Sequence, residues 1–177
     1  MSVINTDDGK AVGPSNPLPT QLMGSNVTDA KALGTGDVGG ANMLYNGATW
    51  DRQRGNSEGT LLASAARTAS LDSPLQTNHN AKGVLVTLKV TAASGTGGVQ
   101  LVIVGRTASG VTVQLNASPT TVIAIGTYVY ELFPGIGVAG GQVTQRTSGT
   151  LPRQWYVRVN HGDATSYTYS VDYDLSV

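Results

Sequence analysis

From residue 60 onward, apolar and polar residues alternate with a period of two, which is the pattern of strands that bury one face. The stretch 83–93 shows this most clearly, since its apolar positions share one face: Val84, Val86, Leu88 and Val90. The stretch 99–107 is apolar on both faces and is interpreted as a central strand. The stretch 110–118 alternates again and predicts three inward-facing side chains, those of Val111, Val113 and Leu115.

The C-terminal residues predict a hairpin. In the stretch 155–161, one face carries Trp155, Val157 and Val159. In the stretch 166–177, the apolar face consists of Tyr167, Tyr169, Val171, Tyr173, Leu175 and Val177. The tetrapeptide GDAT between the two stretches has the composition of a hairpin turn.

Three further stretches, 60–70, 120–127 and 128–135, are candidate strands, although alanine weakens the first. The glycine-rich segment 135–152 is expected to form a long loop, mobile or held by a partner. Roughly seven or eight short strands with frequent turns and no amphipathic helix predict an all-β fold. We therefore assign residues 60–177 to an antiparallel β-sandwich of jelly-roll or immunoglobulin-like type.

Residues 1–42 have a different composition, rich in Gly, Asn, Asp, Ser, Thr and Pro with isolated apolar residues. Pro14, Pro17 and Pro19 fix their own φ angles and bias the preceding residues toward extended geometry. Residues 32–42 follow as a glycine-rich connector. We interpret residues 1–42 as an extended N-terminal arm, which needs its own domain or a neighbour to lie on because it buries little apolar surface itself.

Residues 43–59 are interpreted as a β-hairpin and a junction to the sandwich. Asn46 and Gly47 form the dipeptide that best suits a two-residue type I′ turn. That turn predicts the facing pairs Tyr45–Ala48, Leu44–Thr49 and Met43–Trp50. An isolated hairpin is barely stable, so the face that carries Trp50 is expected to pack on another surface.

Charge and composition limit the kinds of molecule that this chain is expected to bind. The 177 residues include 11 Lys and Arg and 11 Asp and Glu, which gives a formal net charge of +0. A neutral chain has no electrostatic reason to bind nucleic acid or an anionic membrane, and its copies repel one another little. The chain has no cysteine, which excludes disulfides and thiolate metal sites. No secretory signal and no apolar run of membrane-spanning length is visible, so we expect a soluble protein that accumulates in a cytoplasm.

The sequence motifs that could indicate a catalytic or ligand-binding site are weak. Gly34, Gly36 and Gly39 have the spacing of a dinucleotide fingerprint, but polar loop precedes them and a hairpin follows, so a linker is the better interpretation. His79 and His161 lack the spacing of metal ligands and have no neighbouring nucleophile, which favours surface or hydrogen-bonded histidines. No G-x-S-x-G motif occurs.

Two carboxylate pairs, Asp7 with Asp8 and Asp172 with Asp174, are expected to be turn or solvent-facing residues rather than a metal site. We therefore expect no catalytic residues, no metal and no cofactor.

Arg52 and Arg54 follow Trp50 closely. A nucleic-acid surface would need a broader basic patch. Arg and Trp are residue types that anchor protein–protein contacts, so an interface is favoured over an internal ion pair.

Several segments resemble small virion structural proteins of tailed bacteriophages. They are SNPLPTQL, LYNGATWDRQRGN, EGTLLASAARTAS, LQTNHNAKGVLVTLKVTAA and LPRQWYVRVNHGDATSYTYSV. Among such proteins, a capsid decoration or cement protein is most similar in size. The resemblance implies a β-sandwich with an extended arm, a homotrimer, binding to the major capsid protein and a place on the capsid surface after synthesis in the bacterial host cytoplasm.

Intersubunit contacts are then expected at Pro14, Pro17, Leu18, Pro19, Leu22, Trp50, Arg52 and Arg54. At about 3.3 Å per extended residue, an arm of this length spans on the order of 100 Å and reaches adjacent subunits. A tail or head-fibre component that binds a receptor or glycan is the alternative, with Tyr128, Tyr130 or Trp155 stacking on sugar rings unless, as the alternation favours, they belong to the core. An enzyme is a third hypothesis with no sequence feature behind it.

Overall fold

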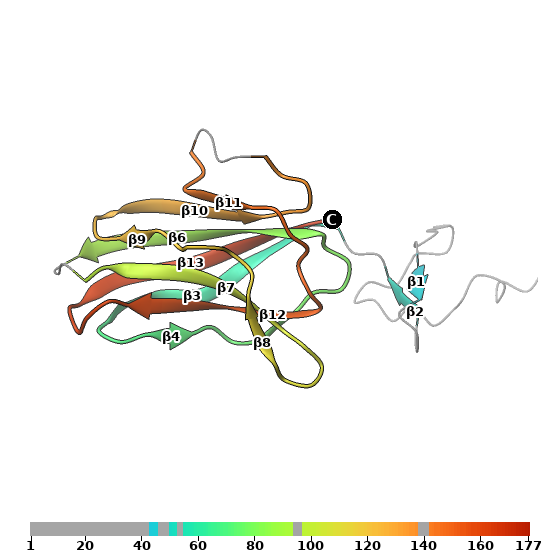
Figure 1. Ribbon diagram of the computed structural model, residues 1–177, viewed down its shortest axis with the longest axis horizontal. Coiled ribbons are helices and arrows are strands. Elements are labelled where there is room, and N and C mark those ends of the chain that lie inside the picture. The colour runs from blue at the N-terminus through green and yellow to red at the C-terminus, as the bar shows by residue number, and fades with distance from the viewer. Residues whose placement is uncertain (1–42, 46–49, 53–54, 94–96, 138–141) are drawn as a thin grey trace, which may run out of the picture. The chain divides into compact units, whose positions relative to one another are not determined.

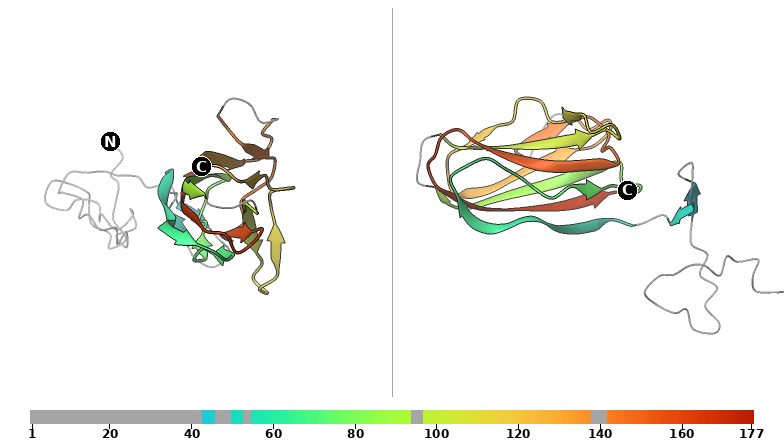
Figure 2. Two further views of the ribbon diagram at one scale, coloured as in Figure 1. Left: turned by 90° about the vertical axis from the view of Figure 1, so that its left-hand side faces the viewer. Right: turned by 90° about the horizontal axis from the view of Figure 1, so that it is seen from below.

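The computed structural model describes residues 43–45, 50–52, 55–93, 97–137 and 142–177, with only the backbone described for 43–45 and 50–52. The chain divides into two units, Met1–Asn42 and Met43–Val177, and every described residue belongs to the second. The described elements are all strands. Two sheets pack face to face around one core, which confirms the predicted β-sandwich (Figures 1 and 2).

The first sheet has five strands in the order β11–β10–β6–β13–β3. Their bounds are β3 (Ser57–Arg67), β6 (Gly83–Ala93), β10 (Gly126–Leu132), β11 (Gln145–Thr147) and β13 (Tyr167–Ser176). Neighbouring strands are antiparallel except for β10 and β11, which run parallel. The pair is parallel because the chain lies beside the middle of β10 again before β11 begins, where the Thr144 amide donates a hydrogen bond to the Val129 carbonyl at 2.8 Å.

The second sheet has six strands, with β12 and β7 at its centre. Its strands are β4 (Leu71–Asp72), β5 (Gln76–Thr77), β7 (Val99–Arg106), β8 (Thr112–Gln114), β9 (Thr121–Val122) and β12 (Gln154–His161). Short strands complete both sides of the central pair. β4 and β5 pair with β12, whereas β8 and β9 pair with the two ends of β7.

The stretches 83–93, 99–107, 155–161 and 166–177 were predicted almost to the residue and are β6, β7, β12 and β13. The hairpin predicted from the last two was wrong, because β12 pairs with β7 in one sheet and β13 pairs with β6 in the other. The stretch 60–70 is β3, shifted toward the N-terminus, and the stretch 128–135 is β10. The stretch 110–118 contains only the short strand β8, and the stretch 120–127 contains the short strand β9 and the first two residues of β10. β4, β5 and β11 were not predicted, and β11 lies in the segment expected to be a loop, because two or three residues show no period.

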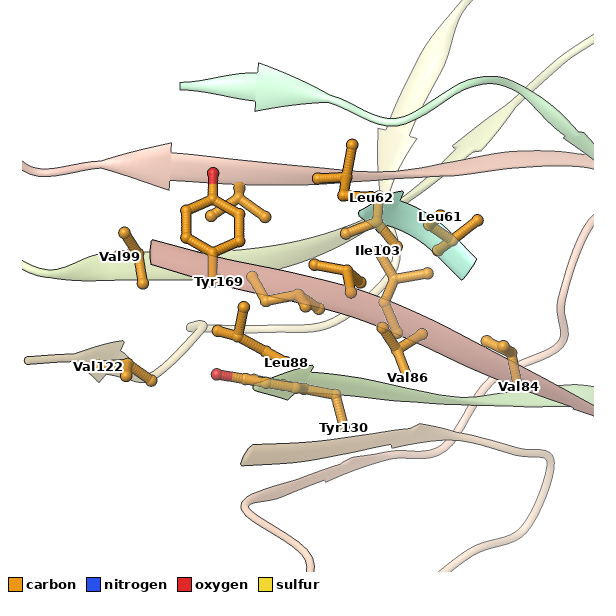
Figure 3. Packing of buried hydrophobic residues seen from close by; sticks show 14 of the residues in the cluster. Leu61, Leu62, Val84, Val86, Leu88, Val99, Ile103, Val122, Tyr130 and Tyr169 are labelled. Carbon is orange, nitrogen blue, oxygen red and sulfur yellow. The ribbon is translucent and has the colours of Figure 1, made fainter. Parts of the chain in front are cut away.

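The core consists of the inward-facing residues of both sheets (Figure 3). The residues predicted to line it are buried on β6, on β12 and along the first part of β13. On β3, Leu61 and Leu62 are consecutive and both buried. The register of β3 against β13 shifts on either side of Val171, and such bulges turn two neighbouring side chains toward one face.

Arg67 stabilises this irregular edge of the sheet. Its guanidinium donates hydrogen bonds to the carbonyl oxygens of Ala63 (2.7 Å), Ala65 (3.1 Å) and Tyr169 (2.7 Å). It also lies 4.5 Å from the centroid of the Tyr169 ring, within the range of a cation–π contact. One planar side chain thus serves three backbone acceptors at the bulge.

Three buried polar residues extend the backbone hydrogen bonding of the sheets: Ser73, Asn78 and Asn116. Ser73 accepts a hydrogen bond from the Val157 amide through its hydroxyl oxygen (3.0 Å). Asn78 accepts from the Ala81 amide and donates to the carbonyls of Ala81 and Leu151. Each of these side chains therefore hydrogen-bonds to backbone groups that no neighbouring strand reaches. Both the side chains and the backbone groups thus have hydrogen-bond partners although they are buried.

The inward positions predicted for Val111 and Val113 were wrong. Val113 lies opposite Gly105, on the core-facing side of its sheet, yet both valines are exposed. The alternation is correct, but the opposite, five-stranded sheet does not cover these side chains at the β8 edge. Only Leu115 is partly buried against the core.

The N-terminal hairpin forms, but its predicted register was wrong. β1 (Met43–Tyr45) pairs with β2 (Trp50–Arg52) in an antiparallel arrangement. Tyr45 lies opposite Trp50, and Met43 opposite Arg52. Four residues rather than two separate the paired positions. The Asn-Gly dipeptide correctly indicates a nearby turn but does not fix the length of the connection, and four-residue connections are also common. With four residues, Tyr45 pairs with Trp50 and not with Ala48, so every partner lies two residues further along the second strand.

Candidate functional site

The residues expected to make intersubunit contacts lie mostly outside the described part of the chain. This holds for Pro14, Pro17, Leu18, Pro19, Leu22 and Arg54. Trp50 and Arg52 belong to β2, of which only the backbone is described. Their contacts therefore stay predictions. The glycine motif 34–39 and the pair Asp7 and Asp8 also lie outside the described residues.

Neither histidine belongs to a group of three or more metal-ligating side chains, because none occurs within the described ranges. His79 is exposed in the loop after β5. His161 ends β12, half-buried, with ring centroids of Tyr167 and Tyr169 at 6.0 Å and 5.9 Å. Its Nε2 lies 3.4 Å from the Tyr169 hydroxyl. This is a packed aromatic cluster rather than a reactive centre.

The His161 environment predicts a pH-dependent stability. Burial lowers the pKa of His161 from 6.5, and Arg67 adds to this, while a backbone bond with Thr165 and the charge of Asp163 oppose it. The unfolded chain therefore takes up this proton first. We expect the free energy of unfolding to fall as the pH drops below about 6.5, measured by urea denaturation.

The exposed His79 provides the matched comparison for this effect. His161→Gln is expected to flatten the decline in the free energy of unfolding, and His79→Gln to leave it unchanged. The pKa of Asp163, which accepts hydrogen bonds from Thr165, and that of Asp72, bonded to Arg158, are lowered from 3.8. Their stabilisation is lost at lower pH than that of His161. An equal decline in His161→Gln and wild type would contradict the assignment.

Asp172 and Asp174 point outward from β13, as the alternation predicted. Asp172 accepts a hydrogen bond from the Thr60 hydroxyl at 2.7 Å, and Asp174 is exposed. No third metal-ligating residue joins them in the described ranges. No described helix is long and apolar enough to cross a membrane.

The aromatic residues considered for glycan stacking lie mainly in the core. Trp155 and Tyr130 are fully buried, as the alternation favoured. Burial raises the pKa of Tyr130 to about 12. Tyr128 is half-buried, and its hydroxyl donates a hydrogen bond to the Ala124 carbonyl at 3.0 Å. Trp155 and Tyr130 therefore offer no open ring face, and Tyr128 is only partly exposed.

A groove of about 320 Å³ crosses the outward side of the six-stranded sheet. Tyr156 lines it and packs with the buried side chains of Val102 and Val104. These residues alternate along β7 and β12 with core residues, so the same period of two that fills the core builds a second, smaller apolar cluster outside. The remaining lining residues are Asp72, Ser73, Leu75, Arg106, Gly110 and Thr112.

One wall of the groove is held by an ion pair. Arg158 donates two hydrogen bonds to the carboxylate of Asp72, at 2.6 Å and 2.7 Å. This contact lowers the pKa of Asp72 and raises that of Arg158. The guanidinium also lies 5.9 Å from the centroid of the Tyr156 ring. The bidentate geometry fixes β4 against β12, and it neutralises the single carboxylate of the groove.

Arg106 lies across the groove and forms no ion pair with any described residue. It ends β7, is exposed, and lies opposite Gln154 and Thr112 in the two neighbouring strands. Leu75 is 42% exposed. The groove thus offers one free guanidinium beside an apolar surface, an arrangement suited to a carboxylate of another protein.

A second feature lies along the edge of the same sheet. Four β-branched aliphatic side chains are more than half exposed: Val111 (58%), Val113 (51%), Ile123 (58%) and Ile125 (66%). The valines accompany β8 at one end of β7, and the isoleucines follow β9 at the other end. The connection before β8 is ordered by hydrogen bonds between Thr107 and Val111, including amide 107 to carbonyl 111 at 2.8 Å.

These surfaces were missed by the sequence analysis. A signal existed for Tyr156 and Arg158, which occupy the outward positions of a strand whose inward positions were identified correctly. No signal existed for Asp72 or Leu75, because they lie in or beside a two-residue strand.

Comparison with protein-family models, with curated proteins and with solved structures finds no match for this chain.

Proposed function

We propose that this chain is a capsid decoration protein that binds the major capsid protein of a tailed bacteriophage and stabilises the head. The observation that carries the proposal is the exposure of Val111, Val113, Ile123 and Ile125 beside the two short strands, β8 and β9, at the edge of the six-stranded sheet. Aliphatic side chains held on a rigid sandwich lose little conformational entropy on contact, and their burial is favourable by roughly 25 cal/mol per Å². The resemblance of the sequence to virion structural proteins supports the same function.

The predicted arm supplies reach in this proposal, and the sandwich supplies a rigid attachment. Pro14, Pro17, Leu18, Pro19 and Leu22 remain the proposed arm contacts, and Trp50, Arg52 and Arg54 the proposed contacts near the sandwich. The fibre alternative has less support, because Tyr130 and Trp155 are core residues with no ring face available to a sugar.

The test is a reconstitution on purified phage heads. Heads that lack this chain are expected to lose their DNA at a lower temperature, and to resist chelator less, than complete heads. Adding the wild-type protein should restore both properties. The double variant Val113→Asp with Ile125→Asp should bind at least roughly tenfold more weakly, because each change places a carboxylate in an apolar contact.

Ser64→Asp with Thr68→Asp provides the control, since both residues are exposed, lie in or just after β3 at an edge of the other sheet, and add the same charge. This control should bind as the wild type does. Heads that are equally resistant with and without the protein would refute the proposed function.

A further inference from the structure

The groove beside Tyr156 continues into a second hollow on the outward side of the six-stranded sheet, and the two share Asp72 as a lining residue. The second hollow has a volume of about 430 Å³ and is lined by Ser70, Leu71, Asp72, Arg158 and Asn160. Tyr156, Arg158 and Asn160 alternate along β12 with core residues, so both hollows follow this strand. Together they form the extended groove, which is about 20 Å long from Gln154 to Asn160 at roughly 3.3 Å per residue.

The extended groove has one unneutralised charge among its described lining residues. Its charged residues are Asp72, Arg106 and Arg158. Asp72 and Arg158 neutralise each other through their bidentate contact, whereas Arg106 forms no ion pair with a described residue. The excess positive charge therefore lies at one end of the groove, where it favours a carboxylate that comes from another molecule.

The position of Arg106 suits the binding of such a carboxylate. Arg106 and Thr112 lie opposite each other on β7 and β8, and both line the groove. The guanidinium lies beside Gly110, with its Nη2 atom 3.7 Å from the place that a Cβ of residue 110 would take. Gly110 has a φ of 88°, a conformation that favours glycine, so no side chain covers the guanidinium there. Arg106 and the exposed Thr112 hydroxyl thus present donors to one carboxylate.

Two exposed leucines supply an apolar surface further along the groove. Leu75 is 42% exposed and lines the first hollow, and Leu71 is 40% exposed and lines the second. Leu71 lies opposite Val159, whereas Leu75 precedes β5, which pairs with the start of β12. Alternate side chains of an extended segment share one face. A segment aligned with β12 can therefore place a carboxylate at Arg106 and aliphatic side chains two and four residues away.

We propose that the extended groove binds an extended segment of a partner protein that carries a carboxylate at one end and two aliphatic side chains at alternate positions. The carboxylate accepts hydrogen bonds from Arg106 and Thr112, and the aliphatic side chains cover Leu75 and Leu71. Tyr156 packs with two buried valines, so this part of the surface is already ordered and binding costs little conformational entropy. The contact goes beyond the proposed capsid binding, because it uses other residues than the exposed valines and isoleucines at the β8 and β9 edge.

The test is a titration of the ¹⁵N-labelled full chain with end-capped peptides, followed by amide chemical shifts. The probes are Asp-Thr-Leu-Thr-Leu and its reverse Leu-Thr-Leu-Thr-Asp, which cover both chain directions, and the same two peptides with Lys in place of Asp. One acidic peptide should bind with a Kd on the order of 1 mM and shift the amides of Leu71, Leu75, Thr112 and Tyr156. The Lys peptides should bind at least about tenfold more weakly.

Charge reversal at Arg106 provides the second part of the test. Arg106→Glu should weaken binding of the acidic peptide at least about tenfold and should bind the matching Lys peptide more tightly than the wild type does. Arg153→Glu is the control, since this exposed arginine lines neither hollow and gives the same change in net charge. It should bind the acidic peptide as the wild type does.

Four results would overturn the proposal: no shift at about 10 mM peptide, shifts confined to residues outside the groove, equal affinity for acidic and Lys peptides, or equal binding by Arg106→Glu and Arg153→Glu. Sodium acetate is titrated as well. If acetate gave the same shifts at the same affinity, the groove would hold a free carboxylate and the segment proposal would also fail. None of these results alters the capsid reconstitution with the Val113 and Ile125 variants, so the proposed function is judged separately.

Discussion

Trp155→Ala is expected to lower the free energy of unfolding by about 3–5 kcal/mol, which is the usual cost of removing a large buried aromatic side chain. Trp155 is fully buried on β12, and its ring meets that of Tyr173 edge-on at 5.5 Å between centroids. The indole Nε1 bonds to no described residue, so the loss reflects packing and the cavity left behind. Urea denaturation followed by far-UV circular dichroism measures it.

Trp155→Phe is the matched control, because it keeps an aromatic ring in the same position and leaves a smaller cavity. Its loss should be clearly smaller than that of Trp155→Ala. Gly105 lies directly opposite Trp155 on β7, and a Cβ there would come within 2.8 Å of Pro152, so this neighbour has little room to repack. A loss below about 1 kcal/mol for Trp155→Ala would contradict the assigned core position.

Asn116→Ala is expected to cost about 2–4 kcal/mol, because it leaves two buried backbone groups without partners. The Asn116 side chain accepts a hydrogen bond from the Ile103 amide (2.8 Å) and donates one to the Leu101 carbonyl (2.9 Å). These groups lie on the edge of β7 between the segments covered by β8 and β9. The side chain thus replaces the missing part of a strand.

Two measurements separate this role from a general loss of stability. Hydrogen exchange at the Ile103 amide should accelerate in Asn116→Ala more than at amides in the β6–β13 pair. Asn160→Ala, on the neighbouring strand β12, should change the free energy of unfolding by no more than about 0.5 kcal/mol, since no hydrogen bond of its side chain is present among the described residues. An unchanged Ile103 exchange rate would show that another group serves this edge.

Local alternation was sufficient to predict the long strands and most of the core. Val84, Val86, Leu88 and Val90 follow a strict period of two, and a strand with that pattern has only one way to bury its apolar side. The strands of Trp155 and Tyr167 were predictable for the same reason, but the hairpin predicted between them was wrong, because β12 belongs to the six-stranded sheet and β13 to the five-stranded sheet. The arm contacts and those of Trp50, Arg52 and Arg54 remain predictions from composition and resemblance.

The candidate surfaces required the arrangement of the two sheets. A period of two tells on which side of its sheet a residue lies, and it did so correctly even for Val113. Whether that side is covered depends on how far the opposite sheet extends, which no local pattern records. The same limit applies to Asp72 and Arg158, which are 86 positions apart in the chain and meet only because a two-residue strand joins the edge of β12.

The residue pattern of this chain thus specifies an all-β fold, its principal strands and the side chains that fill the core, because burial of alternate residues is a local demand on each strand. The sheet edges, the bulge at Arg67, the pairing by Asn116 and the opposition of Glu58 to Asp174 arise from contacts between distant segments. They depend on which residues lie opposite one another in neighbouring strands and on which side chains the opposite sheet covers, and both are set only when the strands have paired and the two sheets have packed together.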